Sequence, residues 1–163
     1  MIGIRRFRRT RDGKFRIRLQ APERELLRSL PDQARGLLDT RDSSTFRLFP
    51  VAYAGDPEAD ADYRSLVGNE LLRHHASALE TLATTSDAVE LSEEELQQWL
   101  AALEVLRLVL GTQLDVGEEP EHVARDDPRA PRLAVYRYLS WLQGEIVDTL
   151  AAALPSGGSP EGP

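Results

Sequence analysis

Residues 91–114 read LSEEELQQWLAALEVLRLVLGTQL and contain the clearest helix signal of the chain. Ser92 suits the N-cap position, and Glu95 follows three residues later, which is the spacing of a capping box. Leucines on either side of this cap are placed to form a hydrophobic staple. Apolar residues then recur every three or four positions, so we predict a helix that buries one face. Gly111 is expected to weaken or end it.

Three further segments show the helical spacing of apolar residues, at 22–38, 59–85 and 131–154. Pro22 suits a first helical turn, whereas Pro31 lies inside the first segment and predicts a kink or a break. The last segment has a near-heptad apolar seam. This seam consists of Val135, Leu139, Leu142, Ile146, Leu150 and Ala153. We therefore expect a mainly α fold, a helical bundle of about four helical segments.

An N-terminal β-hairpin is expected over residues 4–19, because an Asp-Gly turn signal at 12–13 separates two β-prone runs. A two-residue loop would place Phe7 opposite an arginine. A three-residue loop lets Gly13 adopt a left-handed conformation and places Phe7 opposite Ile17. We prefer the second register, because it gathers the apolar side chains on one face for burial. The apolar face is Phe7, Phe15, Ile17 and Leu19, and the opposite face is Arg6, Arg8, Lys14, Arg16 and Arg18.

The remaining segments have the composition of loops. Residues 40–61 are expected to be mostly loop, with apolar side chains that pack against the helices. Those side chains are Phe46, Leu48, Phe49 and Val51. Residues 115–131 are acidic and rich in proline, so they predict a surface loop. We expect residues 1–154 to form a single domain, and residues 155–163 to be a disordered Pro/Gly/Ser tail.

The charge distribution is uneven. The net charge is −7, but residues 1–19 hold eight basic groups and one acidic group. The rest of the chain holds 12 basic and 26 acidic residues. A basic arm on an acidic body attracts an acidic partner or a nucleic acid. The alternative, which stays open at this point, is that the arm lies against its own acidic body.

The sequence lacks the usual signs of an active site. It has no cysteine, which excludes disulfides, thiolate nucleophiles and zinc–thiolate sites. It has neither a Gly-rich phosphate loop nor a nucleophile elbow. Glu70 and His74 stand four residues apart on one helix, but such a pair is more often a surface hydrogen bond than half of a metal site. We therefore predict no enzyme activity, no metal site and no cofactor.

Two further expectations concern location and aromatic residues. No stretch approaches the roughly 18 apolar residues of a membrane span, and no signal peptide is evident, so we expect a cytoplasmic protein. At least one of Tyr138 and Trp141 should lie off the apolar seam of the last helix. An exposed aromatic residue there would indicate a partner site.

Five stretches of the chain follow one another in an informative order. They read RRFRR…GKFRIRL, ERELLRSLPDQARGLLD, RLFPVAYAGDPEADADYRSL, LSEEELQQWLAALEVLRLVLGTQLDV and DDPRAPRLAVYRYLSWLQGEIVDTL. In this order the chain resembles the AosR-like family, an actinobacterial domain family long described as of unknown function. The resemblance covers nearly everything except the tail. It implies a regulator of the oxidative-stress response that contacts a sigma factor or the transcription machinery.

One departure from the family limits what the resemblance implies. The redox-sensing role in that family relies on paired cysteines. This chain has no cysteine, so the resemblance does not imply thiol sensing here. We expect an acidic protein partner, of the sigma factor or transcription-component kind, and no membrane partner. The expected partner-binding residues are the five basic residues of the hairpin face, Arg6 to Arg18. Nucleic-acid binding through the same face is the alternative, and a homodimer stays open.

Overall fold

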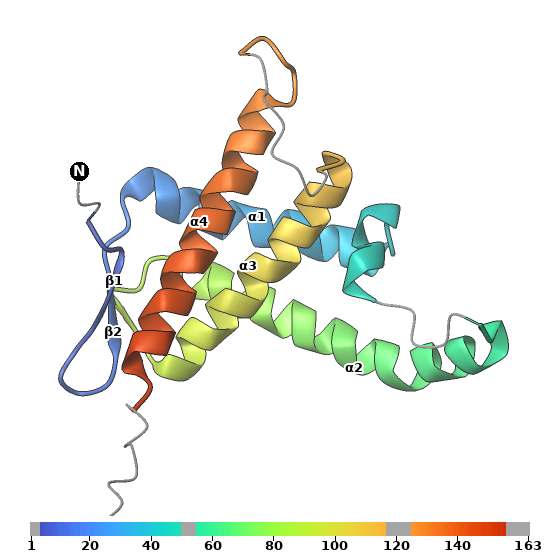
Figure 1. Cartoon of the computed structure of the whole chain (residues 1–163), viewed down its shortest axis with the longest axis horizontal. Coiled ribbons are helices and arrows are strands. Elements are labelled where there is room, and N and C mark those ends of the chain that lie inside the picture. Colours follow the sequence, from blue (N-terminus) through green and yellow to red (C-terminus); the bar gives the residue numbers. More distant parts are fainter. Residues whose placement is uncertain (1–3, 50–54, 117–124, 156–163) are drawn as a thin grey trace, which may run out of the picture.

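The computed structural model describes residues 4–49, 55–116 and 125–155, apart from the side chains of 64–66. Helices make up most of these residues, and a small antiparallel sheet lies at the N-terminal end (Figure 1). The elements in order are β1 (Phe7–Arg9), β2 (Phe15–Ile17), α1 (Ala21–Asp39), the 3-10 helix η1 (Ser43–Leu48), α2 (Pro57–Thr84), β3 (Glu90–Leu91), α3 (Glu93–Gln113) and α4 (Ala130–Ala153). The predicted mainly α fold with an N-terminal hairpin is confirmed.

Helix α3 is the centre of the fold and packs against α1, α2, α4 and η1 (Figure 1). Its start is the predicted capping box. The Ser92 hydroxyl accepts a hydrogen bond from the Glu95 backbone N–H at 3.1 Å, and the Glu95 carboxylate accepts one from the Ser92 N–H at 2.9 Å. Two backbone donors that a helix start leaves unpaired are thereby satisfied. Leu96, Trp99 and Leu103 on the inner face are fully buried.

The hairpin has the preferred register. Phe7 pairs with Ile17, and the Thr10 N–H donates to the Lys14 carbonyl at 2.8 Å, which closes a three-residue loop. Gly13 adopts a φ of 84°, in the left-handed region that glycine enters without a steric penalty. All four predicted apolar side chains are buried. The Phe7 ring meets Trp99 edge-on, with ring centroids 6.3 Å apart, so the apolar face of the sheet packs on α3.

The sequence patterns did not reveal β3. This strand has two residues, and it pairs with β2 so that Phe15 lies opposite Leu91 and Arg16 opposite Glu90. Two residues are too few to show an alternating pattern, and the strand exists because β2 offers it an edge. It ties the start of α3 directly to the sheet.

Three helix predictions need correction or refinement. Helix α1 runs without a break through Pro31, whose ring is buried. Helix α3 continues past Gly111 to Gln113. Within the segment 40–61, expected to be mostly loop, residues 43–48 form η1 and residues 57–61 begin α2. Leu48 is buried but Phe46 is 62% exposed, so the prediction that Phe46 packs on the helices is wrong. Val51 and almost all of the predicted tail lie outside the described residues.

The seam of α4 is confirmed. Leu139, Leu142 and Ile146 are fully buried, and the outer seam positions are partly buried against the same core. This core face packs on α3, while the hairpin strand β1 lies along the C-terminal half of α4 (Figure 1). The arrangement leaves one side of α4 and the outer face of the hairpin next to each other on the surface.

Candidate protein-interaction surface

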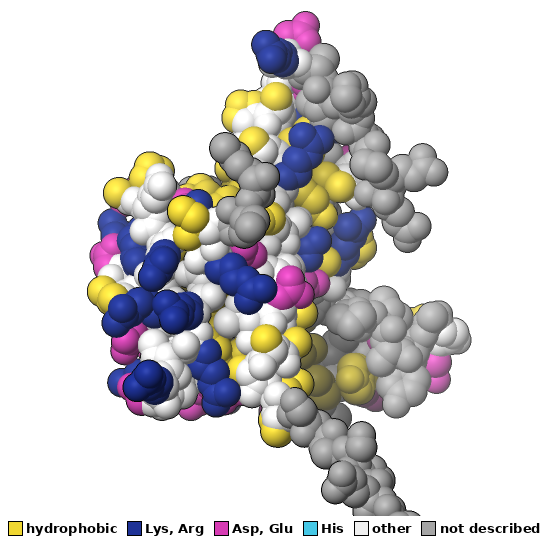
Figure 2. All heavy atoms as spheres, turned by 60° about the vertical axis from the view of Figure 1, so that its left-hand side comes forward, with side chains coloured by type: hydrophobic (Ala, Val, Ile, Leu, Met, Phe, Trp, Pro, Cys, Tyr) yellow, Lys and Arg dark blue, Asp and Glu magenta, His cyan; other side chains and the backbone are white. Residues whose placement is uncertain are grey.

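The outer face of the hairpin carries exposed cations. Side chains alternate across a strand, so burial of Phe7, Phe15 and Ile17 turns their neighbours outward. Four of the five predicted residues are exposed there: Arg8, Lys14, Arg16 and Arg18. Figure 2 shows Lys and Arg side chains gathered over this part of the molecule. We call these four residues the basic face.

The basic face is only weakly neutralised by the domain itself. Arg16 lies 3.5 Å from the Glu90 carboxylate on β3, and both side chains are open to solvent. A pair of this kind contributes little, about 0–1 kcal/mol, and is screened by salt. Within the described residues, Arg8, Lys14 and Arg18 make no salt bridge. Most of the positive charge of this face is therefore available to another molecule.

Arg6 differs from the other four predicted residues. Its Nε lies 3.2 Å from the Glu23 carboxylate of α1, and its guanidinium lies over the Trp141 ring of α4, 5.7 Å from the centroid. Its side chain is 23% exposed. The Arg6 side chain thus lies against Glu23 and Trp141 of its own domain, and the expectation that it projects with the basic face is corrected.

Glu23 joins the hairpin to both neighbouring helices. It accepts hydrogen bonds from Arg6 Nε at 3.2 Å, from the Tyr138 hydroxyl at 3.1 Å and from the Gln20 backbone N–H at 2.7 Å. Glu145 of α4 accepts a further bond from the Arg6 backbone N–H at 3.0 Å. Burial, and then the negative charge of Glu23, raise the pKa of the Tyr138 hydroxyl, so it stays a neutral donor.

Trp141 is the exposed aromatic residue at this surface. Its side chain is 44% exposed, whereas Tyr138 one turn earlier is partly buried, which confirms the expectation for this pair. The two rings lie 6.0 Å apart. Sequence reasoning did not identify Glu23 or Glu145 as partners of Arg6, because they lie 17 and 139 residues away and no local spacing signals such contacts. Trp141 is thus an exposed aromatic ring on α4, joined to the hairpin through the guanidinium of Arg6.

A basic hollow adjoins the basic face. It has a volume of about 360 Å³ and lies between β1 and the C-terminal end of α4. Four arginines contribute to its lining: Arg5, Arg8, Arg9 and Arg18. Arg9 also donates to the Ala153 carbonyl at 3.4 Å, which satisfies one of the carbonyls left unpaired at the end of α4. Arginine forks of this kind bind carboxylates with two parallel hydrogen bonds.

Comparison with known proteins identifies the family of this chain. A family model described as "Domain of unknown function (DUF2017)" matches residues 4–150. Proteins named "Oxidative stress regulator AosR" from Mycobacterium bovis and Mycobacterium tuberculosis are each 31% identical to this chain over 189 residues, covering 88% of this chain and 87% of the relative. The chain belongs to the AosR-like family. No solved structure matches it.

The Glu70–His74 pair, the possible half of a metal site, lies on the surface of this AosR-like chain. Glu70 and His74 are both exposed on α2, and the described residues contain no group of three or more metal-ligating side chains that could hold an ion. His75, beside them, is half-buried, and its Nε2 lies 3.4 Å from the Leu48 carbonyl of η1.

None of the described helices combines the length and apolar character needed to cross a membrane.

Proposed function

We propose that this AosR-like domain is a non-enzymatic regulatory module that binds an acidic protein partner through its basic face. The names of its relatives support a role in the response to oxidative stress. In that role the partner is a sigma factor or another component of the transcription machinery. Because the chain has no cysteine, its regulation does not pass through a thiol.

The observation that carries this proposal is the rigid presentation of the basic face. The hairpin is anchored by its buried apolar side and by the Arg6–Glu23 and Arg6–Glu145 hydrogen bonds. The backbone that carries these cations is therefore ordered before binding, and the planar forks of the arginines suit carboxylates. The neighbouring Trp141 adds apolar area, and tryptophan and arginine are enriched at the centres of protein interfaces.

Nucleic-acid binding by the same face is the second candidate. Its support is the exposed positive charge of the hairpin, which could contact phosphates. Two features favour the protein partner instead. The rest of the chain is strongly acidic, with 26 acidic against 12 basic residues outside 1–19, so it repels a wrapped polyanion. Furthermore, the described aromatic residues do not alternate with the cations on this face, as base stacking would require.

The decisive variant replaces the basic face with glutamine. Its changes are Arg8→Gln, Lys14→Gln, Arg16→Gln and Arg18→Gln. A matched control removes four positive charges elsewhere: Arg35→Gln, Arg47→Gln, Arg73→Gln and Arg137→Gln. The probes are purified mycobacterial RNA polymerase and its free sigma factors, with binding measured by biolayer interferometry at two salt concentrations. We expect the basic-face variant to lose binding mainly through a slower on-rate, while the control keeps it.

A labelled DNA duplex separates the two candidates. The DNA alternative predicts binding whose logarithm falls with the logarithm of salt at a slope near −0.9 per phosphate contacted. Salt-steep duplex binding that is lost in the basic-face variant, together with no binding of either protein probe, would favour the alternative. If the basic-face variant binds the protein probe as tightly as the native chain does, the face is only solvated and the proposal fails.

A further inference from the structure

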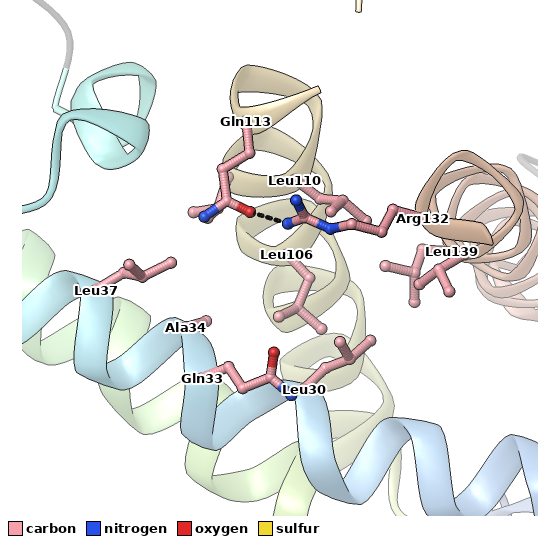
Figure 3. A pocket seen from close by; sticks show the side chains of 11 residues that line it. Leu30, Gln33, Ala34, Leu37, Leu106, Leu110, Gln113, Arg132 and Leu139 are labelled. Atoms are coloured by element: carbon pink, nitrogen blue, oxygen red, sulfur yellow. Dashed lines mark hydrogen bonds between the residues drawn. The ribbon is translucent and has the colours of Figure 1, made fainter. Parts of the chain in front are cut away.

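A second hollow, unrelated to the hairpin, lies where α1, α3 and α4 meet (Figure 3). Its volume is about 370 Å³ and it is open on one side. α1 contributes Leu30, Ala34 and Leu37, while α3 and α4 contribute Leu106 and Leu139 among others. Figure 3 shows these side chains directed toward a common space from the three helices. Pockets that bind small molecules have volumes of about 300–1,000 Å³ and mostly apolar linings.

The depth of this hollow is apolar. Among its lining residues Ala34, Leu106 and Leu139 are buried, and Leu30 and Val135 are partly buried against the same core. A chain of methylene groups placed here would lose part of its contact with water, which favours binding. The lining thus suits a hydrocarbon group of moderate length.

Three polar residues also line the hollow. They are Gln33 of α1, Gln113 of α3 and Arg132 of α4, and all three are exposed. The Arg132 guanidinium donates a hydrogen bond to the Gln113 side-chain oxygen, which orients it across the space between α3 and α4 (Figure 3). A guanidinium has five N–H donors, so this bond uses a minority of them. The Gln113 amide nitrogen is a further donor beside it.

We propose that this hollow binds a small amphipathic carboxylic acid. Its alkyl chain lies among the leucines, and its carboxylate accepts hydrogen bonds from Arg132 and Gln113. Arg132 is the single charged residue among those that line the hollow, which matches a ligand with one negative charge rather than a phosphate with two. The site is separate from the basic face, so this proposal stands or falls independently of the function proposed above.

The test compares octanoate with 1-octanol, which has the same chain length but no charge, by isothermal titration calorimetry. We expect Arg132→Gln to weaken octanoate binding about tenfold, since a hydrogen bond to a charged group is lost, and to leave octanol binding within about twofold. Arg137→Gln is the matched control, on the same helix but outside the lining, and it should change neither. Equal octanoate binding by the native chain and Arg132→Gln would overturn the proposal.

A second variant tests the apolar depth. Ala34→Leu places three extra carbon atoms in the hollow and should abolish binding of both probes. If this variant does not fold, amide chemical shifts of the native chain give the answer instead: octanoate should move the signals of Leu37 and Val135 and leave Arg16 unchanged. A native chain that binds neither probe contradicts the proposal. So does a dimer, found by sedimentation, that Ala34→Leu dissociates, because the occupant is then a second copy.

Discussion

The indole N–H of Trp99 donates a hydrogen bond to the Thr85 hydroxyl at 2.7 Å, which joins the middle of the core to the C-terminal end of α2. Thr85 in turn donates to the Thr81 carbonyl at 2.5 Å. Trp99 is fully buried, so its N–H has no access to water. The buried Trp99 N–H therefore depends on one acceptor, the Thr85 hydroxyl.

Replacing Thr85 with valine should destabilise the domain. The valine has nearly the same shape but leaves the Trp99 N–H buried without an acceptor, which costs about 1–3 kcal/mol. Urea unfolding followed by tryptophan fluorescence measures the loss. Thr84→Val is the matched control, since Thr84 is exposed and bonds only within its own helix. Equal effects of the two substitutions would show that the Trp99 bond contributes nothing.

Two helical glycines should respond differently to alanine. Gly144 of α4 is exposed, and a Cβ there meets nothing within 4 Å, so Gly144→Ala should raise the free energy of unfolding by up to about 1 kcal/mol. Gly111 of α3 is buried, and a Cβ there would lie 3.2 Å from the Tyr136 ring. Gly111→Ala should gain none of this stabilisation, because Tyr136 must shift.

Thermal and urea unfolding of the two glycine variants measure this contrast. Gly111→Leu is the stronger test, because its larger side chain must push α3 and α4 apart and should destabilise the domain by more than about 1 kcal/mol. A Gly111→Leu variant as stable as the native chain would mean that the helices do not approach closely here.

Ser92→Ala should lower the free energy of unfolding by about 1 kcal/mol, because α3 loses its N-cap. The Ser92 hydroxyl accepts from Glu95 N–H in the capping box, and the alanine has no acceptor to replace it. Ser77→Ala on the exposed side of α2 serves as the control. Urea unfolding of both variants checks the prediction, and a Ser92→Ala change near zero would place the true helix start elsewhere.

Stability should fall as the pH drops below about 6.5, the ordinary pKa of histidine. Burial lowers the pKa of His75, and the nearby His74 adds to this, although the Leu48 carbonyl partly opposes it. The unfolded chain therefore binds a proton at a higher pH than the folded chain does, and stability is lost as the pH falls through this range. The carboxyls of Asp12 and Asp42 have lowered pKa values and titrate below 3.8, outside this window.

Urea unfolding at pH 7.5 and pH 5.5 measures this dependence. His75→Gln should flatten it, whereas the matched variant His74→Gln, on the exposed neighbour, should largely keep it. A native pH dependence that His75→Gln leaves unchanged would assign the effect to another group.

Local sequence signals were sufficient for several parts of the molecule. The capping box of α3 needs only Ser92 and Glu95, which are neighbours in the chain. The hairpin register follows from the alternation of apolar residues and from a glycine that can adopt a positive φ. The seam of α4 follows from helical spacing alone. In each case the signal lies within one helix or one hairpin, where backbone geometry sets which side chains share a face.

The candidate surface was predicted only in part. Alternation along the strands correctly turned Arg8, Lys14, Arg16 and Arg18 outward. The same rule would turn Arg6 outward, yet a flexible arginine side chain at the end of a strand bends toward an acid that tertiary packing has placed nearby. The apolar hollow between α1, α3 and α4 had no sequence signature, since three separate helices form it.

The sequence by itself determined where the four long helices and the N-terminal hairpin form, which faces of them are apolar, and that no thiol chemistry is available. The tertiary structure alone decided that β3 joins the sheet, that α3 continues through Gly111 against Tyr136, and that Arg6 lies between Glu23 and Trp141. The physical reason is the separation along the chain of the residues that interact. Helix and hairpin signals act between residues a few positions apart, whereas these contacts join residues that only the packing of whole elements brings together.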